Sequence, residues 1–398
     1  MSRIETIATQ CTGCTACTSA CSTHALRMVI NSEGFLYPQL SENLCVRCGQ
    51  CEKVCPIINS KNTENITNIS YAAKADDDEL RRKSASGAFF QIVAEAFISN
   101  DGYVCGCILD EKLYVKHIVT NRLEDVRKMA DSKYVQSDLR GCFSDIKVLL
   151  YAGKRVLFSG TSCQVHGLKQ YLMYEKCDME NLMTIDFFCH GVPSPGIWKD
   201  FLNYYEKKRK VKVADFRFRC KEYGWGEAAR GTNDLHTLYY RLADKGTLYK
   251  DQSMLVRKWR QIFFSDYALR KGCSSCKYCT VNKPADITMG DFWKLNKVLP
   301  EFNDNKGTSI VITHNERSNL LLKSLEGITV EETDVEASLQ GQKNAYVASK
   351  LPVKYEQFWQ DYHKKGFEYV LRKYYYSPYC LFKDLVKIIR YKLHLGNL

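Results

Sequence analysis

The 398-residue sequence predicts an α/β protein with a small cysteine-rich domain at its N-terminus and a helical tail at its C-terminus. Cysteines recur at short, regular intervals within the first 55 residues. Farther along the chain, short apolar runs alternate with segments of helical periodicity, which is typical of a sheet covered by helices. With 45% hydrophobic and 26% charged residues, the chain is long enough to bury a core in more than one domain.

The N-terminal cysteines repeat the spacing C-x2-C-x2-C-x3-C in two runs, which are Cys11, Cys14, Cys17, Cys21 and Cys45, Cys48, Cys51, Cys55. This spacing is the ligand pattern of bacterial-type ferredoxins with two 4Fe-4S clusters. Three close cysteines reach three irons of one cubane while the fourth reaches the other, so we expect Cys55 to complete the first set and Cys21 the second. A disulfide framework has no reason to repeat one spacing, and zinc takes four thiolates per site, so two cubanes are the preferred interpretation.

Composition narrows the functional class. No run of 18 apolar residues occurs, and the first residues lack the apolar core of a signal peptide, so we expect a cytoplasmic protein. Nineteen cysteines in a reducing compartment favour metal ligation over disulfides. The formal charge of +12 falls to about +8 once two clusters are bound. Without a zinc finger or an arginine-rich arm, nucleic-acid binding is not expected.

The chain divides into four expected parts: a ferredoxin-like domain at 1–58, a polar linker at 59–70, an α/β domain at 71–345 and a basic helical tail at 346–398. We expect a mixed, largely covered sheet. The predicted strands are 69–75, 102–109, 113–119, 155–160, 182–191, 285–293 and 309–315. The predicted helices are 88–98, 123–129, 138–154, 165–172 and 196–208.

Three loops of the α/β domain combine a strand end with a helix start. Gly160, Thr161, Cys163 and Gln164 follow one strand, and the segment 189–195 follows another. Helix N-termini favour anions, and ligands collect beyond the carboxyl ends of strands, so the two loops are candidates for one shared site. The third loop contains Lys83, Ser84, Ser86 and Gly87, which are suited to hold a phosphate or simply to cap a helix.

Cys273, Cys276 and Cys279 form a further C-x2-C-x2-C run without a fourth member. Three such ligands hold three irons of a third 4Fe-4S cluster, and the fourth ligand then comes from elsewhere in the fold. Its candidates are Cys163, Cys189 and Cys220. Zinc and buried structural cysteine remain alternatives. The cysteines expected in the core are Cys105, Cys107, Cys142, Cys177 and Cys380.

Several motifs in order resemble the coenzyme F420 hydrogenase/dehydrogenase beta-subunit family, in the version fused to a two-cluster ferredoxin. They are Lys83 to Gly87, Lys133 to Ser137, Phe158 to Gln164, Cys189 to Gly191, Arg217 to Arg219 with Gly224 and Trp225, and Cys273 to Trp293. Relatives often have proline at the position of Ser162 and a second glycine at that of Ala88. The resemblance implies FAD beside a 4Fe-4S cluster, with coenzyme F420 as a substrate that exchanges hydride, although the fold does not fix the substrate.

A flavin that exchanges hydride as a pair and passes single electrons to clusters gives roles to further residues. Lys133 is the candidate to neutralise reduced flavin, and Gln136 to hydrogen-bond the edge of its ring. His190 is a candidate proton donor, or alternatively stabilises a turn. Asp286 and Asp291 are candidates to orient a ribose or a cationic partner, or are merely solvated.

The tail has a charge balance of +5 between residues 351 and 398, and Pro378 divides it into two predicted helices. Packing against the main domain or a partner subunit is preferred over contact with a membrane surface. The sequence as a whole predicts an iron-sulfur flavoprotein oxidoreductase that moves electrons between a small-molecule hydride donor or acceptor and a ferredoxin or other electron-transfer partner protein. The alternatives are a non-catalytic electron-transfer subunit and a redox sensor.

Overall fold

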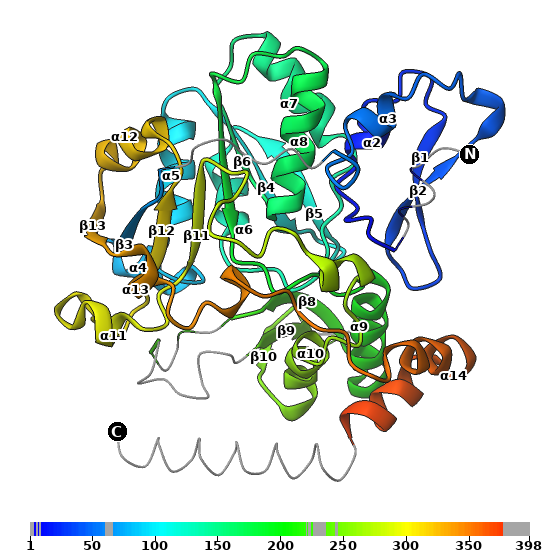
Figure 1. The fold of residues 1–398 in the computed structure, drawn as a ribbon. Coiled ribbons are helices and arrows are strands. Elements are labelled where there is room, and N and C mark those ends of the chain that lie inside the picture. Colours follow the sequence, from blue (N-terminus) through cyan, green and yellow to red (C-terminus); the bar gives the residue numbers. More distant parts are fainter. Residues whose placement is uncertain are drawn as a thin grey trace, which may run out of the picture.

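The computed structural model describes residues 4, 7, 9–59, 67–219, 221, 224–225, 236–242 and 246–376. Figure 1 shows a central sheet flanked by helices, a small N-terminal domain at one side, and a second, smaller sheet beside helices near the C-terminal part of the chain. The expected fold class, a mixed α/β sheet preceded by a small domain, is confirmed. Within the described residues, no helix is both long enough and apolar enough to span a bilayer.

The N-terminal domain is built from loops that carry the eight regularly spaced cysteines. Its regular elements are β1 (Leu26–Ile30), β2 (Leu36–Leu40), α2 (Ala16–Ser19), α3 (Gln50–Lys53) and the 3-10 turn η1 (Glu42–Leu44). β1 and β2 pair antiparallel. Positive backbone angles at Gly13 (φ 72°) and Gly49 (φ 71°) let the chain turn tightly beside Cys14 and Cys48.

The central sheet has eight strands in the order β13-β3-β12-β11-β7-β6-β4-β5. Their bounds are β3 (Ile69–Ala75), β4 (Tyr103–Leu109), β5 (Val115–Thr120), β6 (Val156–Ser159), β7 (Leu182–Phe187), β11 (Ile287–Asp291), β12 (Ser309–Thr313) and β13 (Ile328–Thr333). The four strands β4, β6, β7 and β11 run parallel, whereas the pairs β4–β5, β11–β12, β12–β3 and β3–β13 are antiparallel. The parallel strands therefore end at one edge of the sheet, and β3 ends there too.

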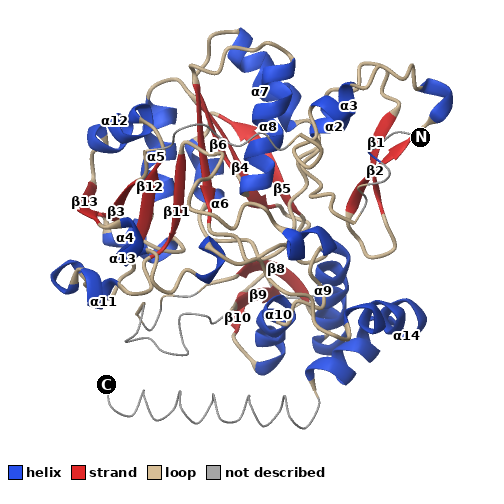
Figure 2. Ribbon diagram, viewed as in Figure 1, coloured by secondary structure: helices blue, strands red, loops and turns tan. Residues whose placement is uncertain are grey.

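Helices cover both faces of this sheet (Figure 2). One face packs on α5, α6 and α12 through apolar residues such as Phe89, Val93 and Leu322. The other face packs on α7 and α8 through Phe143, Val165 and neighbours. The bounds are α4 (Asp78–Lys83), α5 (Phe89–Ser99), α6 (Leu123–Met129), α7 (Cys142–Tyr151), α8 (Ser162–Tyr174), α11 (Leu295–Val298), α12 (Glu316–Ser324) and α13 (Val335–Ser338).

The smaller sheet and three helices form a second core rich in aromatic side chains. The strands β8 (Lys212–Arg217), β9 (Thr237–Arg241) and β10 (Leu248–Asp251) pack with α9 (Pro195–Arg209), α10 (Met254–Phe264) and α14 (Tyr355–Tyr375). Trp198, Trp259 and Trp359 are all buried in this core. The remaining 3-10 turns are η2 (Lys271–Ser275), η3 (Pro300–Phe302) and η4 (Lys343–Ala345).

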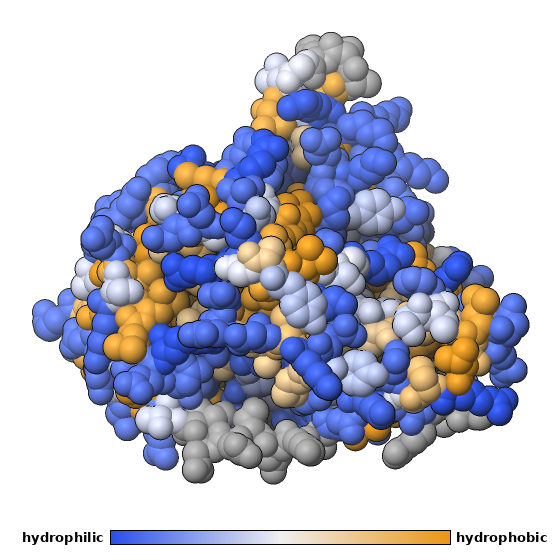
Figure 3. Space-filling model, turned by 90° about the horizontal axis from the view of Figure 1, so that it is seen from above, coloured by the Kyte–Doolittle hydropathy of each residue, from blue (hydrophilic) through white to orange (hydrophobic). Residues whose placement is uncertain are grey.

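The described part of the tail docks onto the molecule through α14. Its apolar residues Phe358, Phe367, Val370 and Leu371 belong to the same core as α9 and α10. The second helix predicted after Pro378 lies outside the described residues. Seen from above, the surface of the molecule is mostly hydrophilic, with apolar side chains in separate groups (Figure 3).

Candidate functional site

The carboxyl edge of the central sheet gathers the loops in which the sequence predicts a site. β6 leads into the N-terminus of α8, β7 leads into the loop of Cys189 and His190, and β11 ends at Asp291. β3 reaches the same edge and is followed by α4 and the loop of residues 84–87. Ligands of open α/β sheets bind at this edge because the loops there enclose a crevice.

Five thiols come together beside this edge: Cys163, Cys189, Cys273, Cys276 and Cys279. Burial raises the pKa of Cys189 well above its ordinary value, and the neighbouring thiolates of Cys273, Cys163 and Cys276 raise it further. Burial likewise raises the pKa of Cys273 to about 12, with added effects from Cys163 and Cys276. A hydrogen bond between the thiols of Cys276 and Cys279 lowers the pKa of Cys276 to about 6 and raises that of Cys279. Cys220, the third candidate for a fourth ligand, lies outside the described residues.

Four of the eight N-terminal thiols surround one cavity. They belong to Cys11, Cys14, Cys17 and Cys55, and apolar residues complete the lining. The pKa of Cys14 rises to about 12, mainly through burial and also through the thiolates of Cys55 and Cys11. Of the second set, Cys21, Cys45 and Cys51 are partly buried and Cys48 is exposed. Donors of this kind and number fit a cubane.

In the described part of the chain, no three His, Cys, Asp or Glu side chains are placed to hold a single metal ion. A cubane separates its thiolates more widely than a single ion does, because each thiolate binds a different iron.

The two groups of thiols lie next to each other across the boundary of the N-terminal domain. A Cβ atom added to Gly167 of α8 would lie 2.8 Å from Cys14 Sγ, so α8 and this cysteine are in direct contact. The thiolate of Cys163 acts on the pKa of Cys14 and raises it. Tyr278 fills the space between the groups, and its hydroxyl bonds His166 Nδ1 at 2.8 Å. The N-terminal domain is therefore packed against the site rather than tethered at a distance.

The loop of residues 84–87 is held closely against β12. Gly87 N donates to Ser309 Oγ at 3.0 Å, and Ser86 Oγ donates to the Thr308 carbonyl at 2.9 Å. A Cβ on Gly87 would lie 2.2 Å from the Ala73 carbonyl, so only glycine fits there. Ser84 is buried, whereas Lys83 is exposed and pairs with Glu79 at 3.0 Å.

Two cations follow β8, and one of them, Lys221, contacts this loop. Lys221 Nζ donates to the carbonyls of Arg81 (2.7 Å), Lys306 (3.1 Å) and Ser86. Burial lowers the pKa of Lys221 to about 7. Arg219 pairs with Asp291 at 2.6 Å, and its guanidinium lies 4.2 Å from the ring centroid of Trp225 and 5.6 Å from that of Trp293. Three buried oxygens nearby, Ser84 Oγ, Thr308 Oγ1 and Asp291 Oδ1, have no hydrogen-bond partner among the described residues.

The other predicted site residues already have partners in the protein. Lys133 Nζ donates to the carbonyls of Lys128, Ala130 and Asp131 at 2.6–3.0 Å. Thr161 and Gln164 form a capping box at the start of α8, with Thr161 N donating to Gln164 Oε1 at 2.8 Å. Gly160 lies beside the same glutamine. Gln164 Nε2 in turn donates to Ser137 Oγ at 3.1 Å.

His190 and Asp286 are also engaged. His190 Nε2 lies 2.7 Å from Asp266 Oδ1, and the imidazole packs against Phe263 and Phe264. These contacts agree with the turn-stabilising alternative, and proton donation by His190 stays a prediction. Asp286 is buried and accepts from Thr184 N at 2.8 Å, so it joins β11 to β7.

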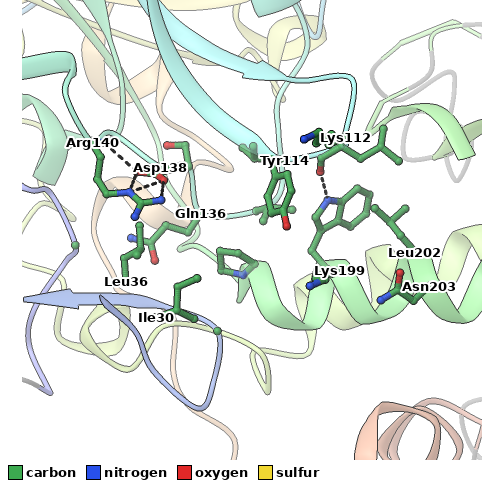
Figure 4. A pocket seen from close by; sticks show the side chains of 18 of the residues that line it. Ile30, Leu36, Lys112, Tyr114, Gln136, Asp138, Arg140, Lys199, Leu202 and Asn203 are labelled. Atoms are coloured by element: carbon green, nitrogen blue, oxygen red, sulfur yellow. Dashed lines mark hydrogen bonds and ion pairs between the residues drawn. The ribbon is translucent and has the colours of Figure 1, made fainter. Parts of the chain in front are cut away.

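A cavity of about 270 Å³ lies between the N-terminal domain and α9 (Figure 4). Ile30 and Leu36 line it from the N-terminal domain, and Tyr114, Lys199 and Leu202 line it from the rest of the chain. Gln136 reaches its wall, but the Gln136 amide donates to the Thr12 carbonyl at 3.0 Å. Gln136 therefore joins the two parts of the chain in this structure.

Comparison with known proteins agrees with this geometry. Residues 153–337 match the family model that describes the C-terminal part of the beta subunit of coenzyme F420 hydrogenase/dehydrogenase. This segment is therefore similar to the C-terminal part of those beta subunits. Residues 10–57 match the model of the 4Fe-4S dicluster domain, which covers all eight regularly spaced N-terminal cysteines. The beta-subunit segment contains both Cys163 and Cys189 and all of the Cys273–Cys279 run.

A solved structure with a similar chain is the xenon-derivatised F420-reducing [NiFe] hydrogenase complex from Methanosarcina barkeri. The similarity has a TM-score of 0.43 and 12% identity, and covers 79% of this chain and 95% of that chain. No curated protein matches significantly. The family and the dicluster domain together make this chain an iron-sulfur electron-transfer protein related to the beta subunits.

Some residues of the site were not predicted from the sequence. Lys221 follows no recognisable spacing, and its partners come from segments far apart in the chain. Arg219 lay within a motif of the family resemblance, but its position between Trp225 and Trp293 required the fold.

Proposed function

We propose that this protein is a flavin-dependent iron-sulfur oxidoreductase that passes electrons between a hydride carrier or small substrate, FAD and 4Fe-4S clusters. FAD would lie along the carboxyl edge of the central sheet. A third cubane would be held by four of the five thiols beside that edge. The two clusters of the dicluster domain would then carry electrons to a partner protein.

The observation that supports the FAD site is the set of unpartnered polar atoms at this edge. Ser84 Oγ, Thr308 Oγ1 and Asp291 Oδ1 are buried without a hydrogen bond in the described part of the chain, and burying a polar atom unpaired costs about 1–3 kcal/mol. Lys221 and Arg219 lie beside them. Hydroxyls, a carboxylate and cations are the groups that bind the phosphates and ribose of a dinucleotide.

The chemistry follows from the neighbouring groups. A bound flavin supplies the exchange of one hydride for two single electrons. The five thiols lie at the ends of β6 and β7 and in the run after η2 begins, so a cubane held there neighbours the same edge. Cys14 of the dicluster domain lies next to α8, which begins at that edge. Lys133, whose amine is fixed by three carbonyls, would place a positive charge near the edge.

Coenzyme F420 is the substrate proposed from the family, and a ferredoxin or another electron-transfer protein is the proposed partner. The matched family consists of beta subunits, which by their description work beside other polypeptides, and this supports a protein partner for the present chain as well. A non-catalytic electron-transfer subunit is the alternative, and the flavin distinguishes the two.

The first test is cofactor content and reduction. Anaerobically purified protein should hold about twelve irons, four per cubane, and about one FAD per chain. Reduced coenzyme F420, NADH, NADPH and reduced ferredoxin are then added separately while the flavin absorbance is followed. Bleaching by one of the hydride carriers supports the proposal. Protein with about eight irons and no flavin would overturn it in favour of the electron-transfer subunit.

The second test identifies the ligands of the third cubane. Single serine variants are made at Cys163, Cys189, Cys273, Cys276 and Cys279. Because a cubane takes four thiolates, four variants should fall from about twelve to about eight irons and one should keep all twelve. Cys177→Ser is the matched control, since Cys177 is buried in the core of α7 and α8 and belongs to neither group. Full iron content in all five variants would refute the third cubane.

A further inference from the structure

Arg270 lies at the junction between the dicluster domain and the rest of the chain, and its side chain is 0% exposed. Its Nε donates to the carbonyl of Cys11 at 2.6 Å and its Nη2 to the carbonyl of Leu36 at 3.0 Å. Its Nη1 donates to Gln136 Oε1 at 2.9 Å. The guanidinium also lies 4.0 Å from the ring centroid of Tyr37. The rigid fork of arginine thus joins the two parts of the chain by two hydrogen bonds, and the third holds the guanidinium against Gln136 of its own part.

The charge of this guanidinium has no anionic side-chain partner among the described residues. The three acceptors are two backbone carbonyls and an amide oxygen, and all are neutral. A buried cation without an anion nearby is strongly disfavoured. The fold therefore needs negative charge close to Arg270 from another source.

Cysteines of both groups of thiols lie close to Arg270. Its Nε bonds the backbone of Cys11, which lines the cavity with Cys14, Cys17 and Cys55. The backbone carbonyl of Arg270 accepts a hydrogen bond from Cys273 N at 2.9 Å. A Cβ atom added to Gly272, which lies between Arg270 and Cys273, would lie 2.8 Å from the carbonyl oxygen of Gln10 and 3.1 Å from that of Cys11. The segment that carries Arg270 and Cys273 is therefore packed directly against the backbone of the first ligand set.

We propose that Arg270 is the counter-charge shared by two neighbouring 4Fe-4S clusters, one held by Cys11, Cys14, Cys17 and Cys55 and the other by the five-thiol group. A cubane with four thiolates carries about two negative charges when oxidised and about three when reduced. A fixed cation favours the reduced form, so Arg270 raises both reduction potentials. The cluster of Cys21, Cys45, Cys48 and Cys51 receives no direct contact from Arg270.

Electron transfer between the two clusters changes no bonds. One electron leaves the reduced cluster, which loses one negative charge, and the other cluster gains the electron and the charge. Because Arg270 lies between the two ligand sets, it attracts the added charge in either position. Arg270 would therefore lower the energy of the electron on either cluster. The second cluster of this pair rests on the proposed function, whereas the first belongs to the dicluster domain.

Arg270→Gln is the main test, because glutamine keeps a hydrogen-bond donor and removes the charge. The midpoint potentials of the clusters are measured by anaerobic redox titration followed by electron paramagnetic resonance, with signals assigned through the serine variants. We expect the midpoint potentials of the two clusters beside Arg270 to fall by at least about 59 mV, which is a tenfold change in a one-electron reduction equilibrium. The midpoint potential of the third cluster should stay unchanged. Lys271→Gln is the matched control, since Lys271 is an exposed neighbour paired with Glu356 at 2.7 Å. It should shift none of the potentials.

Two further variants separate charge from structure. Arg270→Lys keeps the charge but loses the fork, so both potentials should stay near those of the unchanged protein while thermal stability falls. Gln136→Glu places a carboxylate against the guanidinium, and should lower the same two potentials even if Arg270→Gln fails to assemble. Unchanged potentials in Arg270→Gln or Gln136→Glu protein with full iron content would overturn the proposal, even if stability falls. If the unchanged protein held about eight irons and no flavin, the third cubane and the proposed function would fail, and the potential of the Cys11 cluster would still test Arg270.

Discussion

Arg81 fixes the loop that precedes α5 through a buried ion pair. Its Nη1 and Nη2 each lie 2.6 Å from an oxygen of Asp304, and Nη2 also donates to the Gly307 carbonyl at 2.8 Å. Arg81 is 3% exposed, and Asp304 is the closer of its two carboxylate partners, the other being Asp78 at 3.7 Å. The carbonyl of Arg81 in turn accepts from Lys221. One pair of charges therefore supports both the loop of residues 84–87 and the cation above it.

Asp304→Asn should destabilise the protein by about 1–2 kcal/mol, because it removes the closer of the two carboxylates beside the buried Arg81 charge and leaves only Asp78 at 3.7 Å, while solvent still reaches the carboxamide. Burial raises the pKa of Asp304, but the hydrogen bonds from Arg81 outweigh it and hold this pKa well below its ordinary value of 3.8. A carboxylate with a lowered pKa stabilises the fold above the pKa of the unfolded chain, and that stability is lost as the pH falls further. Melting temperatures of both proteins should differ equally at pH 7 and pH 5 and converge below about pH 4. Glu79→Gln, at an exposed pair, should have almost no effect, and a difference that grows toward low pH would contradict this account.

The residues of the site were predicted from the sequence to different degrees. Cysteine spacing predicts which side chains belong together because the cluster fixes the local chain, and the cavity of Cys11, Cys14, Cys17 and Cys55 agrees with it. Single polar residues carry no such constraint. Gln136 was predicted to bind a flavin edge, yet its two hydrogen-bonding atoms contact Thr12 and Arg270. The flavin role of Gln136 stays a prediction, and its partners depend on domain packing that no local pattern encodes.

At the scale of elements, α5 begins at a strained residue. Ala88 precedes the first residue of α5 with φ 66° and ψ 14°, which is the left-handed region. Members of the family that this chain resembles often have glycine at this position. The conformation explains this preference, because a Cβ atom in the left-handed region costs about 1–2 kcal/mol. Ala88 lies directly after Gly87, which contacts β3 and β12, so the chain has little freedom to adopt another conformation.

Ala88→Gly should therefore stabilise the protein by about 1 kcal/mol, since relief of strain exceeds the added entropy of glycine in the unfolded chain. The measurement is the melting temperature of anaerobic protein at fixed iron content. Ala96→Gly within the same helix is the matched control and should destabilise by about 1 kcal/mol, because glycine is unfavourable in a helix interior. If both variants lowered the melting temperature alike, the strain at Ala88 would not be a factor in stability.

Periodicity predicts the elements of the central sheet well. The predicted strand at 69–75 coincides with β3 and the predicted helix at 123–129 coincides with α6. The predicted helix at 138–154 shortens to α7, Cys142–Tyr151, because Gly141 has φ 89° and ends the preceding turn. The small sheet was not predicted. β8 and β10 are short and largely polar, with burial that comes from α9 and α10, so no apolar alternation marks them.

For the molecule as a whole, the position of the dicluster domain depends on close backbone contacts. A Cβ on Gly34 would lie 2.5 Å from the backbone of Gly196, and Ser194 Oγ donates to the Glu33 carbonyl. Arg270 and Gln136 bond the same domain through Cys11, Leu36 and Thr12. The sequence predicts two domains and their order, but two glycines that meet from segments far apart in the chain leave no local signal. In this arrangement Cys11, Cys14 and Cys55 of the first set are buried, whereas Cys48 of the second set is exposed.

The difference in exposure predicts the order in which oxygen destroys the clusters. Cys11, Cys14 and Cys55 are buried, whereas Cys48 is exposed and Val46 beside it is 66% exposed. Brief exposure of the protein to air should first remove the cluster of Cys21, Cys45, Cys48 and Cys51, because oxidants reach it most easily. Iron content should fall from about twelve to about eight in a fast phase, and the remainder should follow slowly. Cys48→Ser should lack the fast phase while Cys177→Ser keeps it, and loss of all clusters in one phase would show that the packed domain gives its inner cluster no protection.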